Sequence, residues 1–132
     1  MSELLNINVG DPMPLYVQLE RAVRFAIATG KLRIGDQLPT VRELAVELKI
    51  NANTVARVYT ELERSGVVET RRGVGTFIRA RHFEATTLRD RERQFEESLD
   101  RFLAESGALG FSLPEVISRL EARSQKEKRK NG

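Results

Sequence analysis

The sequence predicts a mainly α-helical fold with one small β-hairpin, and three observations support this. Apolar residues recur at three- and four-residue spacing in five separate segments, which is the pattern of helices with one buried face. The spacing changes to the alternation of a strand only after Gly66. Beyond Arg81 charged residues become frequent while the helical spacing continues. We therefore expect one domain at residues 1–80, a helical region at 81–123, and a basic, disordered tail at 124–132, which has no apolar residue to anchor it.

The composition indicates a folded protein and excludes several chemistries. Of the 132 residues, 40% are hydrophobic and 31% are charged, which supplies enough apolar side chains for a core. No stretch reaches the roughly 18 consecutive apolar residues of a membrane helix, and the N-terminus lacks the basic start of a signal peptide. We therefore expect a cytoplasmic protein without membrane contact. The absence of cysteine removes disulfides, thiolate metal sites and thiol catalysis.

The sequence offers little that catalysis or metal binding would require. His82 is the only histidine, and we interpret it as a linker residue just after the predicted hairpin. The carboxylates of Glu92, Glu96 and Glu97 have the spacing of a solvated helix face. No phosphate-binding loop of the G-x-x-x-x-G-K-[ST] type occurs. We therefore expect no enzyme activity, no metal and no cofactor.

Residues 41–62 have the pattern of two short helices with a tight break between them. Thr40 and Glu43 form the T-x-x-E box that opens the first of these helices. The sequence Ile50-Asn51-Ala52-Asn53 interrupts it, and the next helix ends at Ser65-Gly66. An earlier helical pattern begins at Pro14, so a helix-turn-helix domain is predicted. The positions expected to be buried are Val41, Leu44, Ala45 and Leu48 in the first helix of the pair and Val55, Val58, Tyr59 and Leu62 in the second.

A β-hairpin follows these helices. Residues 67–78 form two short strands joined by a glycine-containing turn, and a hairpin in this position is the wing of a winged helix-turn-helix domain. Arg71 and Arg72 flank its tip, and Gly73 and Gly75 allow the backbone to turn and to approach a neighbouring surface closely. We interpret this wing as inserting into a DNA minor groove. The alternative is a solvated turn with two arginines that bind nothing.

The outer face of the helix that follows the break has the chemistry that reads DNA. A major groove admits one α-helix, whose exposed side chains must donate hydrogen bonds and positive charge. Asn51, Asn53, Thr54 and Arg57 lie near the start of this helix, away from its apolar face. For the two asparagines, plain N-capping is an equally good alternative. Arg57 has no evident core role, so we interpret it as a DNA contact.

Positive charge is concentrated in the same block. Residues 14–80 carry 11 Lys and Arg against 7 Asp and Glu, a modest excess that suits a polyanionic partner. Arg42 stands where the supporting helix of a helix-turn-helix crosses the DNA backbone; its alternative is an ion pair with Glu43 or Glu47. A winged helix that contacts protein or RNA is the alternative function. Such a surface would expose aliphatic or aromatic side chains, so the polar face favours double-stranded DNA.

Two long motifs resemble the GntR family of bacterial regulators. One is Pro14-Leu15-Tyr16-x-Gln18-Leu19 followed by Gly30-Lys31-Leu32-x-x-Gly35-Asp36-x-Leu38-Pro39-Thr40-Val41-Arg42-Glu43-Leu44-Ala45. The other is Asn51-Ala52-Asn53-Thr54-Val55-Ala56-Arg57-Val58-Tyr59-x-Glu61-Leu62-Glu63 followed by Arg71-Arg72-Gly73-x-Gly75-Thr76-Phe77. The likeness is collinear and covers about half of the chain.

The resemblance implies a bacterial repressor-type regulator that binds a pseudo-palindromic operator as a homodimer. It implies DNA contacts by Arg42, by residues 51–54 and by the wing tip. Some branches of the family carry arginines where this chain has Ala52 and Ala56, and we expect Arg57 to take over part of their role. The residues predicted to contact DNA are Thr40, Arg42, Asn51, Asn53, Thr54, Arg57, Arg71, Arg72, Gly73 and Gly75.

The C-terminal region resembles the YtrA branch of this family, through Leu103-Ala104-x-x-x-Gly107 and Ser112-Leu113-Pro114-Glu115. Two helices are too few to enclose a drug-sized pocket, so an unidentified small-molecule effector would need a site built by two subunits. The apolar stripe on these helices predicts a dimer interface, and the alternative is packing against the chain's own first domain. The predicted interface residues are Leu88, Phe95, Leu99, Phe102, Leu103, Val116, Ile117 and Leu120.

Overall fold

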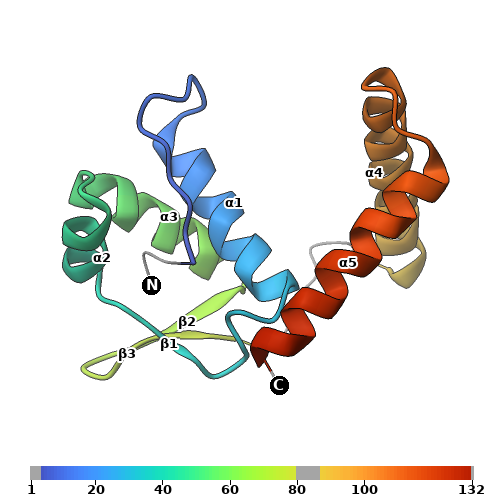
Figure 1. The fold of residues 1–132 in the computed structure, drawn as a ribbon. Helices are drawn as coiled ribbons and strands as arrows, with labels where there is room; N and C mark the ends of the chain where they lie inside the picture. Colours follow the sequence, from blue (N-terminus) through green and yellow to red (C-terminus); the bar gives the residue numbers. More distant parts are fainter. Residues whose placement is uncertain (1–3, 80–86, 132) are drawn as a thin grey trace. The chain divides into compact units, whose positions relative to one another are not determined.

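The computed structural model describes residues 4–79 and 87–131, which belong to two compact units (Figure 1). The first unit lies within residues 1–82 and the second within residues 83–132. The predicted domain boundary at residue 80 and the linker residue His82 lie outside the described residues.

Three helices of the first unit match the sequence pattern. They are α1 (Leu15–Ala28), α2 (Val41–Leu48) and α3 (Ala52–Arg64). The predicted capping box opens α2: the Glu43 N–H donates to the Thr40 hydroxyl at 3.1 Å, and the Thr40 N–H donates to the Glu43 carboxylate at 3.2 Å. Only residues 49–51 separate α2 from α3, so the two helices form the predicted helix-turn-helix.

The wing belongs to a three-stranded antiparallel sheet with the strand order β1-β3-β2 (Figure 1). The hairpin of β2 (Val68–Arg71) and β3 (Gly75–Ile78) confirms the predicted wing. The sequence pattern does not predict β1 (Gln37–Leu38), because two residues are too few to show a period. The backbone of β1 pairs with β3, which attaches the hairpin to the segment ahead of α2.

The core of the first unit joins all three helices to the hairpin. The predicted inner faces of α2 and α3 lie in it, although Val41 and Leu48 are only half-buried. From α1 and β2 the core receives Val23 and Val68. The largest fully buried side chains are Leu19, Val23, Leu44, Val55, Val58, Leu62 and Val68. The apolar spacing in the sequence therefore identifies the faces that pack together.

The segment ahead of α1 also contributes to this core, which the sequence pattern does not predict. Leu5 is buried among the core residues. The side-chain amide of Gln18 holds the segment: it accepts from the Asn8 N–H at 2.8 Å and donates to the carbonyls of Asn8 at 3.0 Å and Met13 at 2.8 Å. One glutamine thus replaces the backbone pairing that an irregular segment lacks.

We expect Gly75→Ala to destabilise the first unit by about 1–3 kcal/mol. Gly75 has a φ of +144°, which L side chains rarely adopt, and an added Cβ would collide with the side-chain amide of Gln37. That amide donates to the Val74 carbonyl at 3.1 Å and so supports the turn. Urea unfolding measures the change. Gly107→Ala is the control, because a Cβ there meets nothing within 4 Å, and equal losses in both variants would contradict the argument.

The second unit contains α4 (Leu88–Ala108) and α5 (Leu113–Asn131). Thr87 caps α4 by accepting the Asp90 N–H at 3.0 Å. The predicted S-x-x-E box is present ahead of α5: the Glu115 N–H donates to the Ser112 hydroxyl at 3.4 Å, and the Ser112 N–H donates to the Glu115 carboxylate at 3.2 Å. The pKa of Glu115 lies below its usual range, because its carboxylate accepts from the Ser112 N–H and, at 2.9 Å, from the Ser112 hydroxyl, and both bonds favour the charged form.

The prediction of a disordered tail at 124–132 is wrong for residues 124–131, where α5 continues as far as Asn131. The lack of apolar residues removes a hydrophobic anchor but does not prevent a helix. Residues 121–130 are Glu, Ala, Arg, Ser, Gln and Lys, most of which are strong helix formers, so a helix that is already nucleated extends through them. No helix in the described part of the chain is both long and apolar enough to span a membrane.

Candidate nucleic-acid interface

The start of α3 is fixed by Asn51. Its side-chain oxygen accepts the Asn53 N–H at 2.8 Å, which makes Asn51 the N-cap of the helix. The sequence left N-capping and a DNA contact as alternatives for Asn51, and in the structure Asn51 caps the helix. Asn53, the second residue of α3, is exposed, so its side-chain amide is accessible to an external partner.

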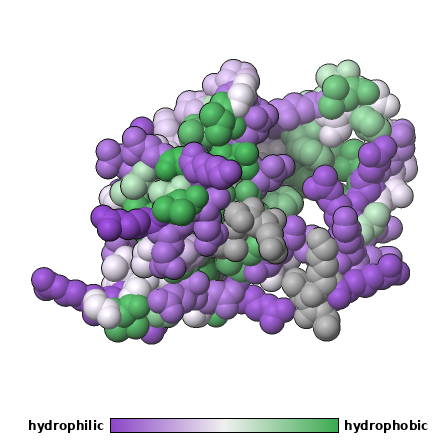
Figure 2. All heavy atoms as spheres, turned by 60° about the vertical axis from the view of Figure 1, so that its left-hand side comes forward, coloured by the Kyte–Doolittle hydropathy of each residue, from purple (hydrophilic) through white to green (hydrophobic). Residues whose placement is uncertain are grey.

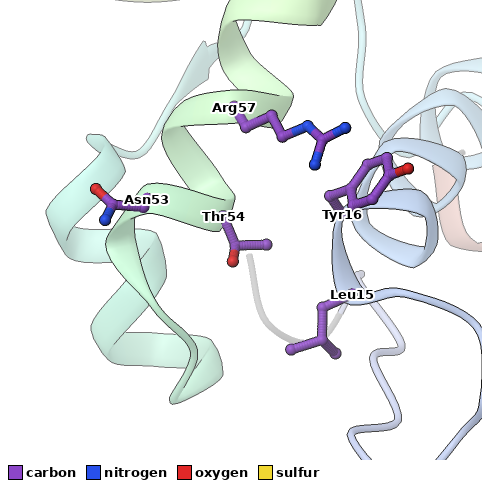
Figure 3. Close-up of a pocket in the computed structure, with 5 residues that line it drawn as sticks. All are labelled: Leu15, Tyr16, Asn53, Thr54 and Arg57. Atoms are coloured by element: carbon purple, nitrogen blue, oxygen red, sulfur yellow. The ribbon is translucent and has the colours of Figure 1, made fainter.

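Side chains on the exposed face of α3 point in two directions. Val55, Val58 and Leu62 turn inward as predicted. Thr54 is half-buried and Arg57 is exposed, and Figure 3 shows both side chains pointing toward α1 while Asn53 points away from it. The helix therefore presents an amide on one side and a hydroxyl and a guanidinium on the other.

A shallow groove of about 370 Å³ lies between α1 and α3 (Figure 3). Its lining residues are Leu15, Tyr16, Asn53, Thr54 and Arg57. Within it, the guanidinium carbon of Arg57 lies 3.6 Å from the centre of the Tyr16 ring, the distance of a close cation–π contact. The sequence pattern misses Tyr16 as a site residue; the only signal for it is its place in the Pro14-Leu15-Tyr16 motif.

Thr40 and Arg42 lie at the start of α2, as predicted, and both are exposed. The alternative for Arg42 was an ion pair with Glu43 or Glu47. Glu43 instead accepts the N–H of Thr40, and Arg42 has no ion-pair partner among the residues that the structure describes. The Arg42 guanidinium is therefore available to an external anion.

The wing does not present its two arginines in the same way. The Arg71 guanidinium lies 4.5 Å from the centre of the Phe77 ring and 3.4 Å from the Glu69 carboxylate, so the hairpin itself engages it. Arg72 and Gly73 form the exposed tip, where Gly73 has a φ of +77°. At Gly75 the fold itself favours a glycine, because a Cβ there would collide with the Gln37 side chain. This structural requirement is separate from the DNA contact expected for Gly75.

Tyr59 connects α3 to the start of α2, because its hydroxyl donates to the Pro39 carbonyl at 2.7 Å. Burial, reinforced by the nearby carboxylates of Glu43 and Glu47, raises the pKa of Tyr59 well above its usual range. In the unfolded chain the same phenol ionises near pH 10. The stability that this group contributes is therefore complete below pH 10 and is lost as the pH rises beyond it.

We expect Tyr59→Phe to lower the free energy of unfolding by about 1 kcal/mol at neutral pH, because the Pro39 carbonyl loses its donor. The variant should lose less of its stability than the wild type between pH 9 and pH 11, since it has no phenol to ionise at this position. Urea unfolding at a series of pH values measures both effects. Parallel declines of the two proteins at alkaline pH would contradict the assignment.

The second unit exposes most of the residues predicted for a dimer interface. Val116 is 8% exposed in the single chain, so little of its surface is left for a partner. Leu103 is half-buried. Leu109, Phe111 and Leu113, between and at the ends of the two helices, are further exposed apolar residues that the sequence analysis missed. The predicted interface residues that are exposed are Leu88, Phe95, Leu99, Phe102, Ile117 and Leu120.

The surface in Figure 2 is predominantly hydrophilic, and its hydrophobic atoms gather in separate patches. The described residues contain no cluster of three or more His, Cys, Asp or Glu side chains that could hold a metal ion.

A helix-turn-helix, a hairpin wing and an exposed helix with amide, hydroxyl and guanidinium groups together define a winged-helix DNA-binding regulator.

Comparison with known proteins identifies the family. Residues 15–78 match the family described as bacterial regulatory proteins, gntR family. The chain is 38% identical to the uncharacterized HTH-type transcriptional regulator YhcF of Bacillus subtilis over 104 residues, which cover 79% of this chain and 84% of YhcF. The chain belongs to the GntR family of transcriptional regulators and contains its DNA-binding domain.

The likeness extends beyond the DNA-binding domain. The chain is 32% identical to the HTH-type transcriptional repressor YtrA of Bacillus subtilis over 113 residues, 86% of each chain. Among solved structures, YtrA from Sulfolobus acidocaldarius, a GntR-family transcription factor, is similar with a TM-score of 0.58 and 28% identity, over 76% of this chain and 98% of that one. These matches confirm the predicted fold class and the resemblance to YtrA. The relatives are transcriptional regulators, a class that does not act by catalysis.

Proposed function

We propose that this protein is a transcriptional repressor that binds a pseudo-palindromic operator in double-stranded DNA as a homodimer. The observation that carries the proposal is the exposed start of α3, where Asn53 and Arg57 stand on a helix whose opposite face is anchored in the core. A helix held in this way can enter the major groove without losing its packing.

Asn53 is the base-reading residue in this proposal. An asparagine amide can donate to N7 and accept from N6 of adenine at once, which distinguishes adenine from the other bases. The Asn53 side chain is exposed and points away from α1 (Figure 3), so such a contact needs no rearrangement of the domain. Asn51 contributes by capping α3 and thereby fixing the start of the reading helix.

Phosphate contacts flank the reading helix. Thr40 and Arg42 at the start of α2 supply a hydroxyl and an unpaired guanidinium, which are the groups that hold a helix-turn-helix on the DNA backbone. The wing adds Arg72 and the backbone of Gly73 at its exposed tip. Arg71 takes part only if it leaves the Phe77 ring and Glu69, so we assign it the smaller role.

The homodimer forms through α4 and α5. Phe95 is 62% exposed and Phe102 is 46% exposed, and both lie on a stripe of apolar side chains along α4. Aromatic side chains that lie along one exposed face of a helix are unfavourably solvated, and such faces are typical of protein interfaces. A symmetric pair places two α3 helices about one DNA turn, ~34 Å, apart, as the half-sites of a palindrome require.

The sign of regulation follows the relative YtrA, which is named a repressor. The repressor acts by occupying its operator, for which the surface that holds DNA is sufficient. A small-molecule effector that releases the DNA would bind between the two subunits, since α4 and α5 of one subunit are too few to enclose a drug-sized pocket.

A fluorescence-anisotropy titration tests the proposal. The probes are a duplex from the region upstream of the gene and a scrambled duplex of the same length and composition, both at physiological salt. A preference of about 10³-fold or more for the upstream duplex is expected of a sequence-specific regulator. Equal affinities for both duplexes, or no binding at low salt, would contradict it, and the latter would favour the protein-interaction alternative.

A further inference from the structure

Arg57 lines a second groove together with the carboxylate residues Glu20 and Glu61, but its close contact is with the ring of Tyr16. Its guanidinium carbon lies 3.6 Å from the centre of the Tyr16 ring. Glu61, four residues later on α3, is close enough to feel the Arg57 charge, but it forms its ion pair with Arg64. The usual i, i+4 ion pair of a helix is therefore not formed at Arg57.

The Glu61 carboxylate is firmly engaged. The Arg64 guanidinium donates to both of its oxygens, at 3.0 and 2.5 Å, and this bidentate contact holds the pKa of Glu61 below its usual range. Glu61 thus stays charged and stays turned toward Arg64. Among the described residues Arg57 therefore forms no ion pair with Glu61, and it lines the groove between α1 and α3.

Stacking on a ring leaves the donors of a guanidinium free. The five N–H groups of arginine lie in the plane of the guanidinium, whereas Tyr16 covers one face of that plane. The N–H groups therefore remain available at its edge. They open on the groove that Thr54 and Leu15 also line, and Figure 3 shows Thr54 on the same side of α3 as Arg57.

We propose that Tyr16 is a positioning residue that holds Arg57 at the α1–α3 groove, where Arg57 and Thr54 bind one phosphate of the DNA backbone. The inference rests on the proposed DNA binding and assigns Arg57 to the phosphate and not to a base. A cation kept in one orientation, beside a hydroxyl and in a groove open to solvent, is suited to an anion that arrives from outside.

Three substitutions test the assignment: Arg57→Ala, Tyr16→Leu and Tyr16→Phe. We expect Arg57→Ala to weaken binding to the operator and to a scrambled duplex by the same factor, about tenfold, and to reduce the slope of log K against log salt by about 1. Tyr16→Leu keeps an apolar side chain but no ring, and should weaken both duplexes by about fivefold. Tyr16→Phe keeps the ring and should bind like the wild type.

A double substitution separates positioning from a structural role. If Tyr16 acts through Arg57, Tyr16→Leu should have no effect in the Arg57→Ala background. Additive losses would overturn the inference, as would a loss for Arg57→Ala on the operator alone, which is the result for a base contact. Thermal unfolding of each variant checks that the fold is intact, and Tyr16→Phe should have the wild-type midpoint.

The outcomes also separate this inference from the proposed function on which it rests. If the wild type binds neither duplex, both fail. If the wild type prefers its operator and the Tyr16 and Arg57 variants bind as it does, with an unchanged salt slope, the phosphate assignment alone is overturned.

Discussion

Phe102→Glu is expected to convert the dimer to monomers and to weaken operator binding by about 10²-fold or more. Phe102 is 46% exposed on α4 in the single chain, and a dimer through α4 and α5 would bury its ring. A carboxylate in the same place would have to lose its hydration without a partner, which is costly. The loss at the operator follows because a monomer engages one half-site and gains nothing from the second.

Light scattering measures the mass of the protein directly, and a titration with the operator measures the loss of affinity. Leu99→Glu on the same stripe should give the same result. Ile34→Glu is the matched control. Ile34 is also an exposed apolar residue, but it lies in the first unit. The Ile34→Glu protein should therefore have the same mass as the wild-type dimer. A dimer of unchanged mass in both α4 variants would contradict the assigned interface.

Asn53→Ala is expected to weaken binding to the operator by about 1–3 kcal/mol and to leave binding to a scrambled duplex unchanged. Only a base contact has this property, because phosphate contacts are the same on every sequence. The measurement is the ratio of the two affinities at one salt concentration, together with the affinity for operators changed at single base pairs. The variant should lose its preference at one base pair in each half-site.

Asn51→Ser controls for damage to the helix. Serine accepts the same capping hydrogen bond from the Asn53 N–H but has no amide to read a base. We expect Asn51→Ser to bind the operator as the wild type does. A loss of preference in Asn51→Ser and none in Asn53→Ala would contradict the division of roles between the two asparagines.

The sequence predicts the helix-turn-helix and the wing because local signals determine them. The Thr40–Glu43 box fixes where α2 starts, and the spacing of Val55, Val58 and Leu62 fixes which face of α3 is buried. The resemblance to the GntR family then supplies a function that the residues alone only favour. The helix and hairpin conclusions need only residues that are neighbours along the chain, whereas the resemblance rests on about half of the chain.

Features that depend on partners distant in the sequence are not predictable in this way. The strand β1 exists because Gln37 pairs with Phe77, forty residues later. The N-terminal segment is ordered by contacts of Leu5 with the core and by the Gln18 amide, neither of which has a periodic signal. The tail is helical because helix propensity continues through residues that include no apolar side chain.

In the candidate site, too, contacts between residues that are distant in the sequence are not predictable. The sequence identifies Arg57 as an exposed cation on the reading helix, but not that Tyr16, on another helix, covers one face of it. It treats Arg71 and Arg72 as equivalent, whereas Phe77 and Glu69 engage only Arg71. Residue type and spacing thus select the candidates, and tertiary contacts decide which of them remain available to DNA.

The most direct test of two α3 helices reading two half-sites is a change in half-site spacing. The protected operator is first located by footprinting, and anisotropy titrations then compare it with versions carrying 5 or 10 extra base pairs at its centre. We predict that 5 base pairs, half a DNA turn, weaken binding by about 10²-fold or more, because one α3 then faces away from its groove. The 10-base-pair insertion should be less harmful because it restores the rotational phase. Equal affinity for the native and the 5-base-pair duplex would contradict the account.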